Sequence, residues 1–350
     1  MPYTHHSHSG SYCKHAHDTL DSVIATAIRK QFRTFCLTEH VPRLRQSLVY
    51  PEEEELGMTP ASLREQFYEY VDSARTQQLT VNSNTGSDMR ILVGFESEGG
   101  IDDEHLNMCI ELRNKMNADI VVGSVHHVNG IDIDFDQPTW QKAYEACDGL
   151  RGLYREYYKL VRNMIQKLKP EVVAHFDLIR LFAFTEIEET KVIDGTPQTE
   201  KRKVTLEEQL NVDIKRDWHD VWAIIEEAVD LIVINDLTVE LNSAAIRKGW
   251  NTPYPKNDIM RFMITKGVKF VMSDDSHGND QVGLNYHLVL EYIKQMGIET
   301  MYYYDIVNFG DKSVRDGMGN IILSSVSIEE LVKDPFWQHN YPSFGISTVI

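Results

Sequence analysis

Histidines and carboxylates gather at the start of the chain and recur at intervals along it. The first eighteen residues, MPYTHHSHSGSYCKHAHD, contain five histidines, a cysteine and an aspartate. His6 and His8 form an H-x-H pair. In an extended segment their side chains point to the same side, so both imidazoles can reach one ion at roughly 2.0 to 2.1 Å, and His5 points away. Asp275 and His277 repeat this spacing with one carboxylate.

The residue types also restrict which metals fit. Glu96 carries two oxygens that can bridge two cations. Ligands that mix imidazole and carboxylate without thiolate suit Zn²⁺, Mn²⁺ or Fe²⁺ better than Ca²⁺, and they do not distinguish among those three. The sequence therefore predicts a site for divalent transition metals.

The elements that must position these residues follow from hydrophobic periodicity. Short runs rich in Val, Ile, Leu and Phe alternate with longer stretches of helical period, which is typical of an α/β protein with a largely parallel sheet. The predicted strands are 3–8, 34–40, 90–96, 119–127, 171–177, 237–242 and 269–277, and 300–307 is a further candidate.

Every predicted strand ends in potential ligands. In chain order these are His6 and His8, His40, Glu96, His126 and His127, His175 and Asp177, Glu240 and Asn242, and Asp275 and His277. The carboxyl ends of the strands in a parallel barrel face one side, so we expect these side chains to converge there. Simpler explanations exist for single members: His127 could pack in the core, and His17 and Asp18 could cap the first helix.

Composition narrows the class of protein. The 350 residues include 35 basic and 53 acidic ones, a formal charge of −18 that disfavours nucleic acid and anionic membranes as partners. The four cysteines form no C-x-x-C pair, which argues against a disulfide framework and a thiolate zinc finger. The sequence shows neither a signal-peptide pattern nor an apolar run long enough for a membrane span, so we expect a cytoplasmic protein.

Two segments are longer than usual connections. They are 42–60, after the second predicted strand, and 184–213, after the fifth. Long loops are typically functional lids or disordered segments, and the sequence does not decide which. The acidic run at 52–55 is most simply a solvated surface.

Several segments together resemble a known family. They are HHSHSGSYCKHAHDTLDSV, LTEH, LVGFESE, VVGSVHHV, AHFDLIR and MSDDSHGNDQVG, in this order. The chain is similar, from about residue 5 to 284, to the polymerase and histidinol phosphatase (PHP) superfamily, and specifically to its histidinol-phosphate phosphatases of the monofunctional fungal and bacterial type. The resemblance implies a distorted (β/α)7 barrel, like a TIM barrel, with two to three divalent ions at the carboxyl-terminal face. We expect one domain over 1–350, with insertions at 42–60 and 184–213 and a carboxyl-terminal extension from about 310.

The resemblance also implies a ligand assignment. His6, His8, Glu96 and Asp275 would hold one ion; Glu96, His126 and His175 a second; His15, His40 and His277 a third. The spacing from His8 to His15 is one residue longer than in most bacterial relatives, so His17 is an alternative to His15. His127 is likewise an alternative to His126.

The implied activity is hydrolysis of L-histidinol phosphate, in histidine biosynthesis, with Glu96, Asp275 and His277 as catalytic residues. A multi-metal centre can activate water and clamp the attacking and leaving oxygens without a side-chain nucleophile. The predicted phosphate-binding residues are Arg180, Arg247, Asn242 and Arg43. Asp177, Glu240 and Asn242 are also candidates for orienting histidines or binding the substrate amine.

Other functions fit the same residues. A phosphodiesterase or nuclease could use the same centre, as could a phosphatase for another small phosphate ester. A barrel that keeps metals for structure alone would lack an open coordination position. The sequence leaves open the metal identity and the oligomeric state.

Overall fold

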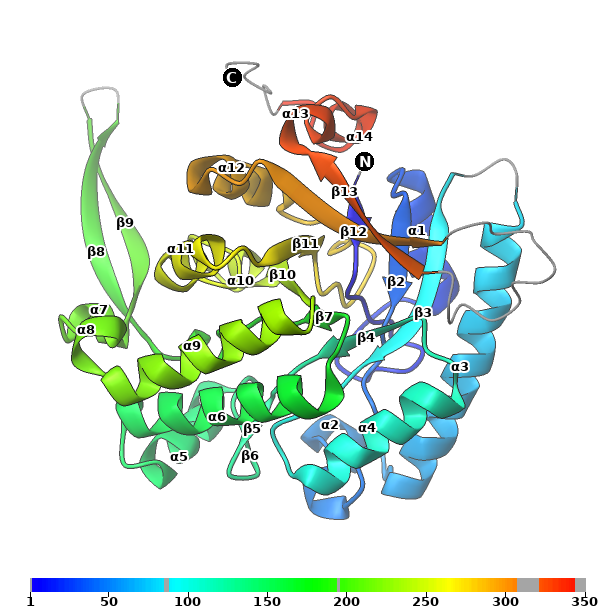
Figure 1. Cartoon of the computed structure of the whole chain (residues 1–350), viewed down its shortest axis with the longest axis horizontal. Helices are drawn as coiled ribbons and strands as arrows, with labels where there is room; N and C mark the ends of the chain where they lie inside the picture. Colours follow the sequence, from blue (N-terminus) through cyan, green and yellow to red (C-terminus); the bar gives the residue numbers. More distant parts are fainter. Residues whose placement is uncertain (1, 85–87, 194–195, 307–320, 344–350) are drawn as a thin grey trace.

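The centre of the protein is a sheet of seven parallel strands, seen in a computed structural model that describes residues 2–84, 88–193, 196–306 and 321–343 (Figure 1). In order around the sheet the strands are β1 (Tyr3–Thr4), β2 (Thr34–Leu37), β3 (Arg90–Glu96), β4 (Ile120–Gly123), β7 (Val172–Val173), β10 (Thr238–Asn242) and β11 (Lys269–Ser273). A parallel bridge between Ser7 and Ser276 joins the segments that follow β1 and β11, the first and last strands in this order. The sheet is thus a nearly closed barrel, and the predicted α/β barrel is confirmed.

Side chains of the barrel strands alternate between the interior and the surrounding helices. Cys36, Leu92, Val122 and Val271 belong to one buried cluster in the interior, whereas neighbouring residues such as Val93 join the larger core outside it. Both faces of each strand are buried, which explains why the strands read as nearly continuous apolar runs.

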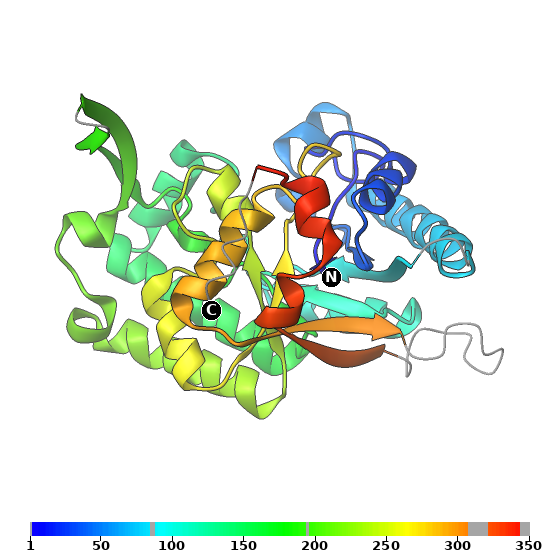
Figure 2. The same ribbon diagram turned by 90° about the horizontal axis from the view of Figure 1, so that it is seen from above.

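Helices connect the strands and cover the barrel (Figures 1 and 2). The longer ones are α1 (Leu20–Arg29), α3 (Pro60–Asn82), α4 (Asp103–Lys115), α5 (Gln137–Ala146), α6 (Leu150–Leu168), α9 (His219–Ile234), α11 (Asn257–Thr265) and α12 (Tyr286–Met296). Shorter ones are α2 (Pro51–Glu55), α7 (Leu206–Gln209), α8 (Ile214–Asp217) and α10 (Ala244–Arg247). The residue that caps α1 is Thr19, whose hydroxyl accepts from the Ser22 amide, so the alternative that His17 or Asp18 caps this helix is wrong.

The further candidate strand at 300–307 forms, but outside the barrel. β12 (Thr300–Ile306) pairs antiparallel with β13 (Ile321–Ser327), and α13 (Ile328–Leu331) and α14 (Pro335–Asn340) follow. Tyr304 of β12 packs into the interior cluster and donates its hydroxyl hydrogen to the Glu171 carbonyl, 2.9 Å away, just before β7. The ribbon therefore lies against the amino-terminal end of the barrel. The expected start of an extension at about 310 falls outside the described residues.

The two long loops contain secondary structure of their own. Segment 42–60 includes a short 3-10 helix (Gln46–Leu48) and α2, and segment 184–213 includes an antiparallel hairpin of β8 (Phe184–Ile193) and β9 (Thr196–Thr205). The hairpin projects away from the barrel (Figure 1). A second, small hairpin pairs β5 (His127–Val128) with β6 (Ile131–Asp132).

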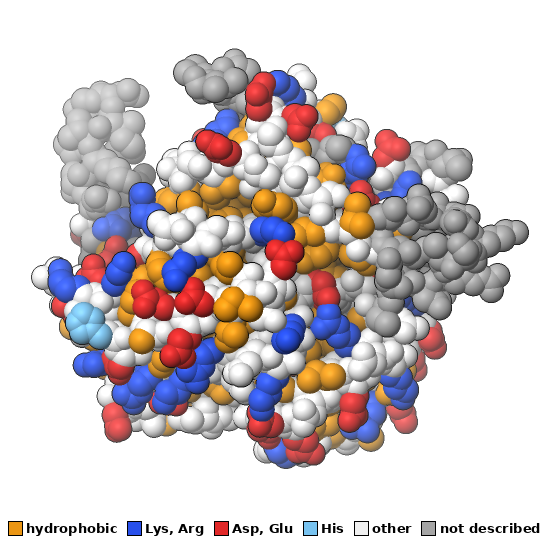
Figure 3. Space-filling model, viewed as in Figure 1, with side chains coloured by type: hydrophobic (Ala, Val, Ile, Leu, Met, Phe, Trp, Pro, Cys, Tyr) orange, Lys and Arg blue, Asp and Glu red, His pale blue; other side chains and the backbone are white. Residues whose placement is uncertain are grey.

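On the face shown in Figure 3, basic and acidic side chains are interspersed, so the excess negative charge is not gathered into one patch there. Within the described ranges, none of the helices combines the length and the apolar character that a bilayer crossing requires.

Candidate metal centre

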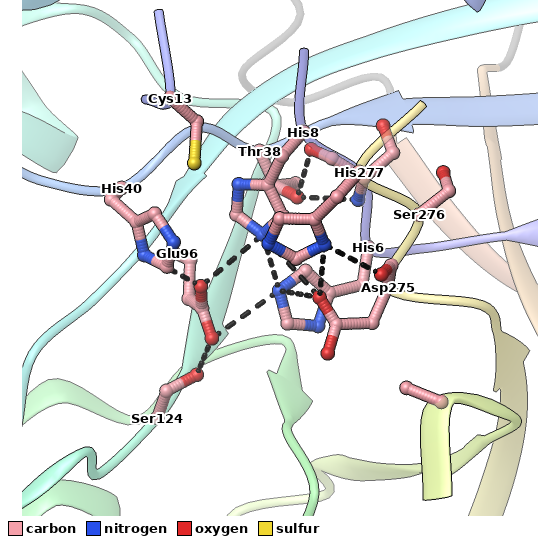
Figure 4. Close-up of polar contacts among 12 residues, drawn as sticks. His6, His8, Cys13, Thr38, His40, Glu96, Ser124, Asp275, Ser276 and His277 are labelled. Atoms are coloured by element: carbon pink, nitrogen blue, oxygen red, sulfur yellow. Dashed lines mark hydrogen bonds and ion pairs between the residues drawn. The ribbon is translucent and has the colours of Figure 1, made fainter. Parts of the chain in front are cut away.

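The Glu96 carboxylate, at the carboxyl end of β3, is the centre of a buried cluster of histidines (Figure 4). Its Oε1 atom lies 3.1 Å from Nε2 of both His126 and His175. Its Oε2 atom lies 2.9 Å from Nδ1 of His40. The Ser124 hydroxyl donates to Oε1 at 2.5 Å. Residues that follow three different strands, β2, β4 and β7, thus converge on one carboxylate of β3, as the sequence predicts.

His6 and His8 approach the same carboxylate from the first strand. Nε2 of His6 lies 3.3 Å from Glu96 Oε1, and Nε2 of His8 lies 3.3 Å from Oε2. The same two ring nitrogens lie 3.7 and 3.5 Å from Oδ1 of Asp275. His5 points away, with Nδ1 2.9 Å from the Met272 carbonyl oxygen, as expected from the alternation along an extended segment.

The ligand-bearing segments are loops that continue the strands. β1 ends at Thr4 and β7 at Val173, so both strands are shorter than predicted and the histidines follow their ends. Ser7 keeps the segment after β1 extended, because its amide donates to Thr38 Oγ1 at 3.0 Å. Asp275 adopts a left-handed conformation (φ 49°), which aspartate tolerates better than most residues. These turns direct side chains over the barrel mouth.

Two further carboxylates lie beside Nδ1 of His6 and His126, the ring nitrogens that do not face Glu96. Glu240 lies 3.3 Å from Nδ1 of His6, and Glu98 lies 3.0 Å from Nδ1 of His126. A carboxylate that accepts the Nδ1–H of a histidine fixes its tautomer and leaves Nε2 free for a metal. Glu98 is a residue of the site that sequence reasoning missed, although it stands two residues after Glu96.

The electrostatics of the cluster reflect this crowding. Burial opposes the charge of His6, but the carboxylates of Glu96, Asp275 and Glu240 outweigh it and raise the His6 pKa well above its ordinary value. Burial likewise opposes ionisation of Glu96, yet His6, His126 and His40 lower its pKa well below the ordinary range. The cluster therefore stabilises ionised carboxylates that are surrounded by ring nitrogens.

The donor set fits divalent cations. Within the described ranges, four buried or half-buried sets of His, Glu and Cys side chains have donor atoms within 4.8 Å of one another. Nε2 of His40 and Nδ1 of His175 are buried without a hydrogen-bond partner in that part of the chain. Unpaired buried nitrogens are costly, and imidazole with carboxylate is a common donor set for transition metals.

The structure distinguishes the alternative histidines. His126 directs Nε2 to Glu96, whereas His127 bonds Glu98 and stacks on Tyr50. The His15 ring centroid lies 5.4 Å from that of His40 and 5.0 Å from that of His277, whereas His17 is exposed and pairs with Asp280. In each pair of alternatives, the histidine that lies in the cluster is therefore His126 or His15.

A cavity of about 510 Å³ opens over the cluster. Besides histidines and Glu96 it is lined by Arg247, Lys14, Lys248, Glu52, Tyr50, Asp132, Asp134, Phe135 and Gln281, among others. Arg247 donates to the carbonyl oxygens of Asp274 and Asp275, each at 3.2 Å, so its guanidinium is anchored at the cavity wall. The acidic pair Asp132 and Asp134 was not singled out from the sequence, although its D-x-D spacing was visible there.

Three of the predicted phosphate-binding residues do not belong to the described lining of this cavity. Arg180 is buried, donates to Asp177 Oδ2 at 2.9 Å, and stacks against Trp250 and Tyr254. This pairing favours a structural role for Arg180, and its predicted contact with phosphate stays a prediction.

The predicted phosphate contacts of Arg43 and Asn242 also stay predictions, and both side chains have partners within the protein. Arg43 is buried against Tyr50 and pairs with Glu53. Asn242 donates to Glu240 Oε1 at 2.7 Å, a contact that is consistent with the predicted orienting role.

Comparison with known proteins gives consistent matches. The model of the PHP domain family matches residues 4–244. The chain is 38% identical over 302 residues to a protein of Schizosaccharomyces pombe named "Probable histidinol-phosphatase", covering 86% of this chain and 89% of the relative. It is 31% identical over 344 residues to the histidinol-phosphatase of Saccharomyces cerevisiae, covering 96% of this chain and 99% of the relative.

A solved structure shares the fold. It is the histidinol phosphate phosphatase of Lactococcus lactis in complex with zinc, L-histidinol and phosphate, with a TM-score of 0.54 and 16% identity over 85% of this chain and 93% of that one.

Proposed function

The chain belongs to the PHP domain family, and on that premise we propose that it is a histidinol-phosphatase. The reaction is hydrolysis of the phosphate monoester L-histidinol phosphate to L-histidinol and phosphate, in histidine biosynthesis. Two fungal relatives of that name, which align over most of both chains, support this proposal. The structural observation that carries it is the Glu96 carboxylate, ringed by histidines at the base of a cavity with both basic and acidic lining residues.

We propose that two or three divalent ions, Zn²⁺, Mn²⁺ or Fe²⁺, bind in the cluster. His6, His8, Glu96 and Asp275 would hold one; Glu96, His126 and His175 a second; His15, His40 and His277 a third. When bound, such ions supply Lewis-acid activation of water and neutralise charge on the phosphoryl group.

The chain's own contribution to this chemistry is to fix the donors in place. Glu96 is held by Ser124 and by its ring of histidines, and His277 is oriented by the carbonyl oxygen of Asp275, 2.9 Å from its Nδ1. Glu96, Asp275 and His277 all line the cavity, which supports their assignment as catalytic residues.

Arg247 is the proposed phosphate ligand from the protein. Its guanidinium has five N–H groups in a planar fork, and two contacts to backbone carbonyls leave others available to phosphoryl oxygens. Lys14 and Lys248 line the same cavity and add positive charge.

The amine end of the substrate requires the opposite charge. Asp132 and Asp134 line the cavity, next to the exposed ring of Phe135. We assign the two carboxylates to the ammonium group of L-histidinol phosphate, a group that generic phosphate esters lack. This assignment accounts for an acidic surface in a site that binds a phosphate.

Three substrates test the function. The purified protein, supplied with Mn²⁺ or Zn²⁺, is assayed against histidinol phosphate, an aryl phosphate and single-stranded DNA. We expect strong preference for histidinol phosphate, loss of activity with a chelator and recovery when metal is returned. Preferential cleavage of DNA would instead identify a nuclease, and chelator-resistant hydrolysis would contradict a metal mechanism.

We further propose that the protein acts in the cytoplasm on a small molecule, without nucleic acid or membrane partners. The formal charge of −18 and four buried cysteines, all free thiols, support this. Cell fractionation with detection of the chain checks the location.

A further inference from the structure

The Cys13 thiol lies at the edge of the metal cluster and has no role in the assignment above. Its sulfur belongs to a set with His8, His40 and His277, in which the donor atoms all lie within 4.8 Å of one another. Cys13 is only 4% exposed, and Figure 4 shows its sulfur directed toward the histidines. The distance from Cys13 Sγ to Nε2 of His15 is 3.1 Å. The thiol is therefore close to every histidine of the third proposed ion.

The backbone, and not a flexible side chain, sets the position of this sulfur. The Cys13 amide donates to the Ser9 carbonyl oxygen at 2.9 Å, and the Ala16 amide donates to the Cys13 carbonyl oxygen at 3.2 Å. Ser9 is itself fixed by Glu39, which accepts from its amide at 2.9 Å and from its hydroxyl at 2.7 Å. Glu39 follows β2, so the turn that carries Cys13 is tied to the barrel.

The neighbouring imidazoles have their Nε2 atoms available for a metal. Nδ1 of His15 lies 2.9 Å from Glu52, and Nδ1 of His277 lies 2.9 Å from the carbonyl oxygen of Asp275, so in each ring Nε2 is the atom left to bind a metal. Nε2 of His40 is buried and finds no hydrogen-bond partner among the described residues. Buried nitrogens in this state are an independent sign that a ligand belongs at the site.

We propose that Cys13 is a protein ligand of the third ion, together with His15, His40 and His277. On binding, the S–H bond breaks, a sulfur–metal bond forms and the proton passes to solvent. One thiolate and three imidazoles make a set of four donors, the number that closed structural zinc sites use. Thiolate is a soft donor, which favours Zn²⁺ over Mn²⁺ at this position alone. The inference rests on the proposed metal centre.

Cobalt substitution tests the ligand directly. The metal-depleted protein is reconstituted with Co²⁺, and its near-ultraviolet spectrum is recorded for a thiolate-to-cobalt charge-transfer band. We expect the band in the wild type and in Cys147→Ser, whose cysteine is also buried but accepts from Asn129. We expect its loss in Cys13→Ser. Absence of the band from the fully loaded wild type, or its persistence in Cys13→Ser, would overturn the proposal.

Two further measurements keep the test decisive. If Cys13→Ser does not fold, the band must survive in single replacements of Cys36, Cys109 and Cys147, and its loss in any folded one of these overturns the assignment. When Zn²⁺ and Mn²⁺ compete for the protein at one metal equivalent, the preference for Zn²⁺ should be at least tenfold lower in Cys13→Ser than in the wild type. An unchanged preference counts against the thiolate.

The outcome for Cys13 is separable from the outcome for the function. Hydrolysis of histidinol phosphate by a cobalt enzyme without the band refutes the ligand and leaves the function standing. A cobalt enzyme that shows the band but does not hydrolyse histidinol phosphate supports the Cys13 ligand and refutes the proposed function.

Discussion

The Glu240 carboxylate and the His6 ring are fully buried partners, with Oε2 of Glu240 3.3 Å from Nδ1 of His6. Glu240 also accepts from the His175 amide at 2.8 Å, the Ser273 hydroxyl at 2.5 Å and the Asn242 side chain at 2.7 Å. One carboxylate thus ties the ends of β7, β10 and β11 to the first histidine of the H-x-H pair, and it holds His6 with Nε2 toward Glu96.

Replacement of Glu240 by Gln should weaken the metal centre without unfolding the barrel. An amide of the same size keeps some of these contacts but loses the charge that favours the Nδ1–H tautomer of His6. Loss of such an outer partner typically costs about 10- to 100-fold in metal affinity or activity. Metal content after dialysis and kcat/KM measure the effect. Glu65→Gln, on the exposed surface of α3, is the control. Equal behaviour of the two variants would refute the orienting role.

Glu96→Gln should abolish turnover while circular dichroism and the unfolding transition still report a folded chain. Glu96 contacts histidines from several strands, so its loss should cost more than the ~10- to 100-fold expected for an outer partner. Activity and bound metal are measured together. Wild-type activity in this variant would remove Glu96 from the bridging position.

Arg247→Ala should raise KM for histidinol phosphate more than it changes metal content. A hydrogen bond to a charged group contributes ~1.5–3 kcal/mol, and tenfold in binding corresponds to ~1.4 kcal/mol, so we expect an increase of about 10- to 100-fold. Steady-state kinetics at saturating Zn²⁺ or Mn²⁺ check this. An unchanged KM would mean that phosphate binds without Arg247.

Arg180→Met should affect stability and not catalysis. Removal of one partner from a buried ion pair costs about 3–5 kcal/mol, because Asp177 is left buried with its charge. Urea unfolding of the metal-loaded protein measures this loss, and KM in the folded protein should stay near the wild-type value. Arg162→Met, which breaks a partly exposed pair with Glu227, should change stability by less than about 1 kcal/mol. A large rise in KM for Arg180→Met with intact stability would instead support its predicted phosphate-binding role.

The acidic pair predicts a pH dependence of substrate binding. Burial, with Asp134 beside it, raises the pKa of Asp132 to about 7. A raised carboxyl pKa means that the charge exists above pH 7 and is lost below it. KM for histidinol phosphate should therefore rise as the pH falls through about 7, by up to about tenfold per unit.

Asp132→Asn isolates this effect from titration of the substrate itself. At high pH the variant should have a higher KM than the wild type. Its KM should also change less with pH, because the contribution from titration of Asp132 is gone. Hydrolysis of an aryl phosphate, which has no ammonium group, should respond little to the substitution. Identical pH profiles for the two proteins would contradict a contact between Asp132 and the amine.

Much of the barrel could be predicted from local patterns. The seven apolar runs marked the strands because both faces of each are buried, and their ends marked the ligands because parallel strands bring those ends together. Glu96 is the clearest case, since it closes the predicted run 90–96 and ends β3 itself. Locally, β12 resembles the barrel strands, and only its pairing with β13 and its packing under the barrel separate it from them.

The sequence by itself determined where candidate metal ligands stand along the chain, because strand period and strand ends follow from neighbouring residues. Tertiary structure alone decided which of two adjacent histidines turns inward, why Arg247 lines the cavity while Arg180 is buried against Asp177, and that Cys13 and Asp132 belong near the centre. The physical reason is that a side chain after the end of a strand takes its direction from partners far away in sequence, such as Glu98 for His126 or Glu240 for His6.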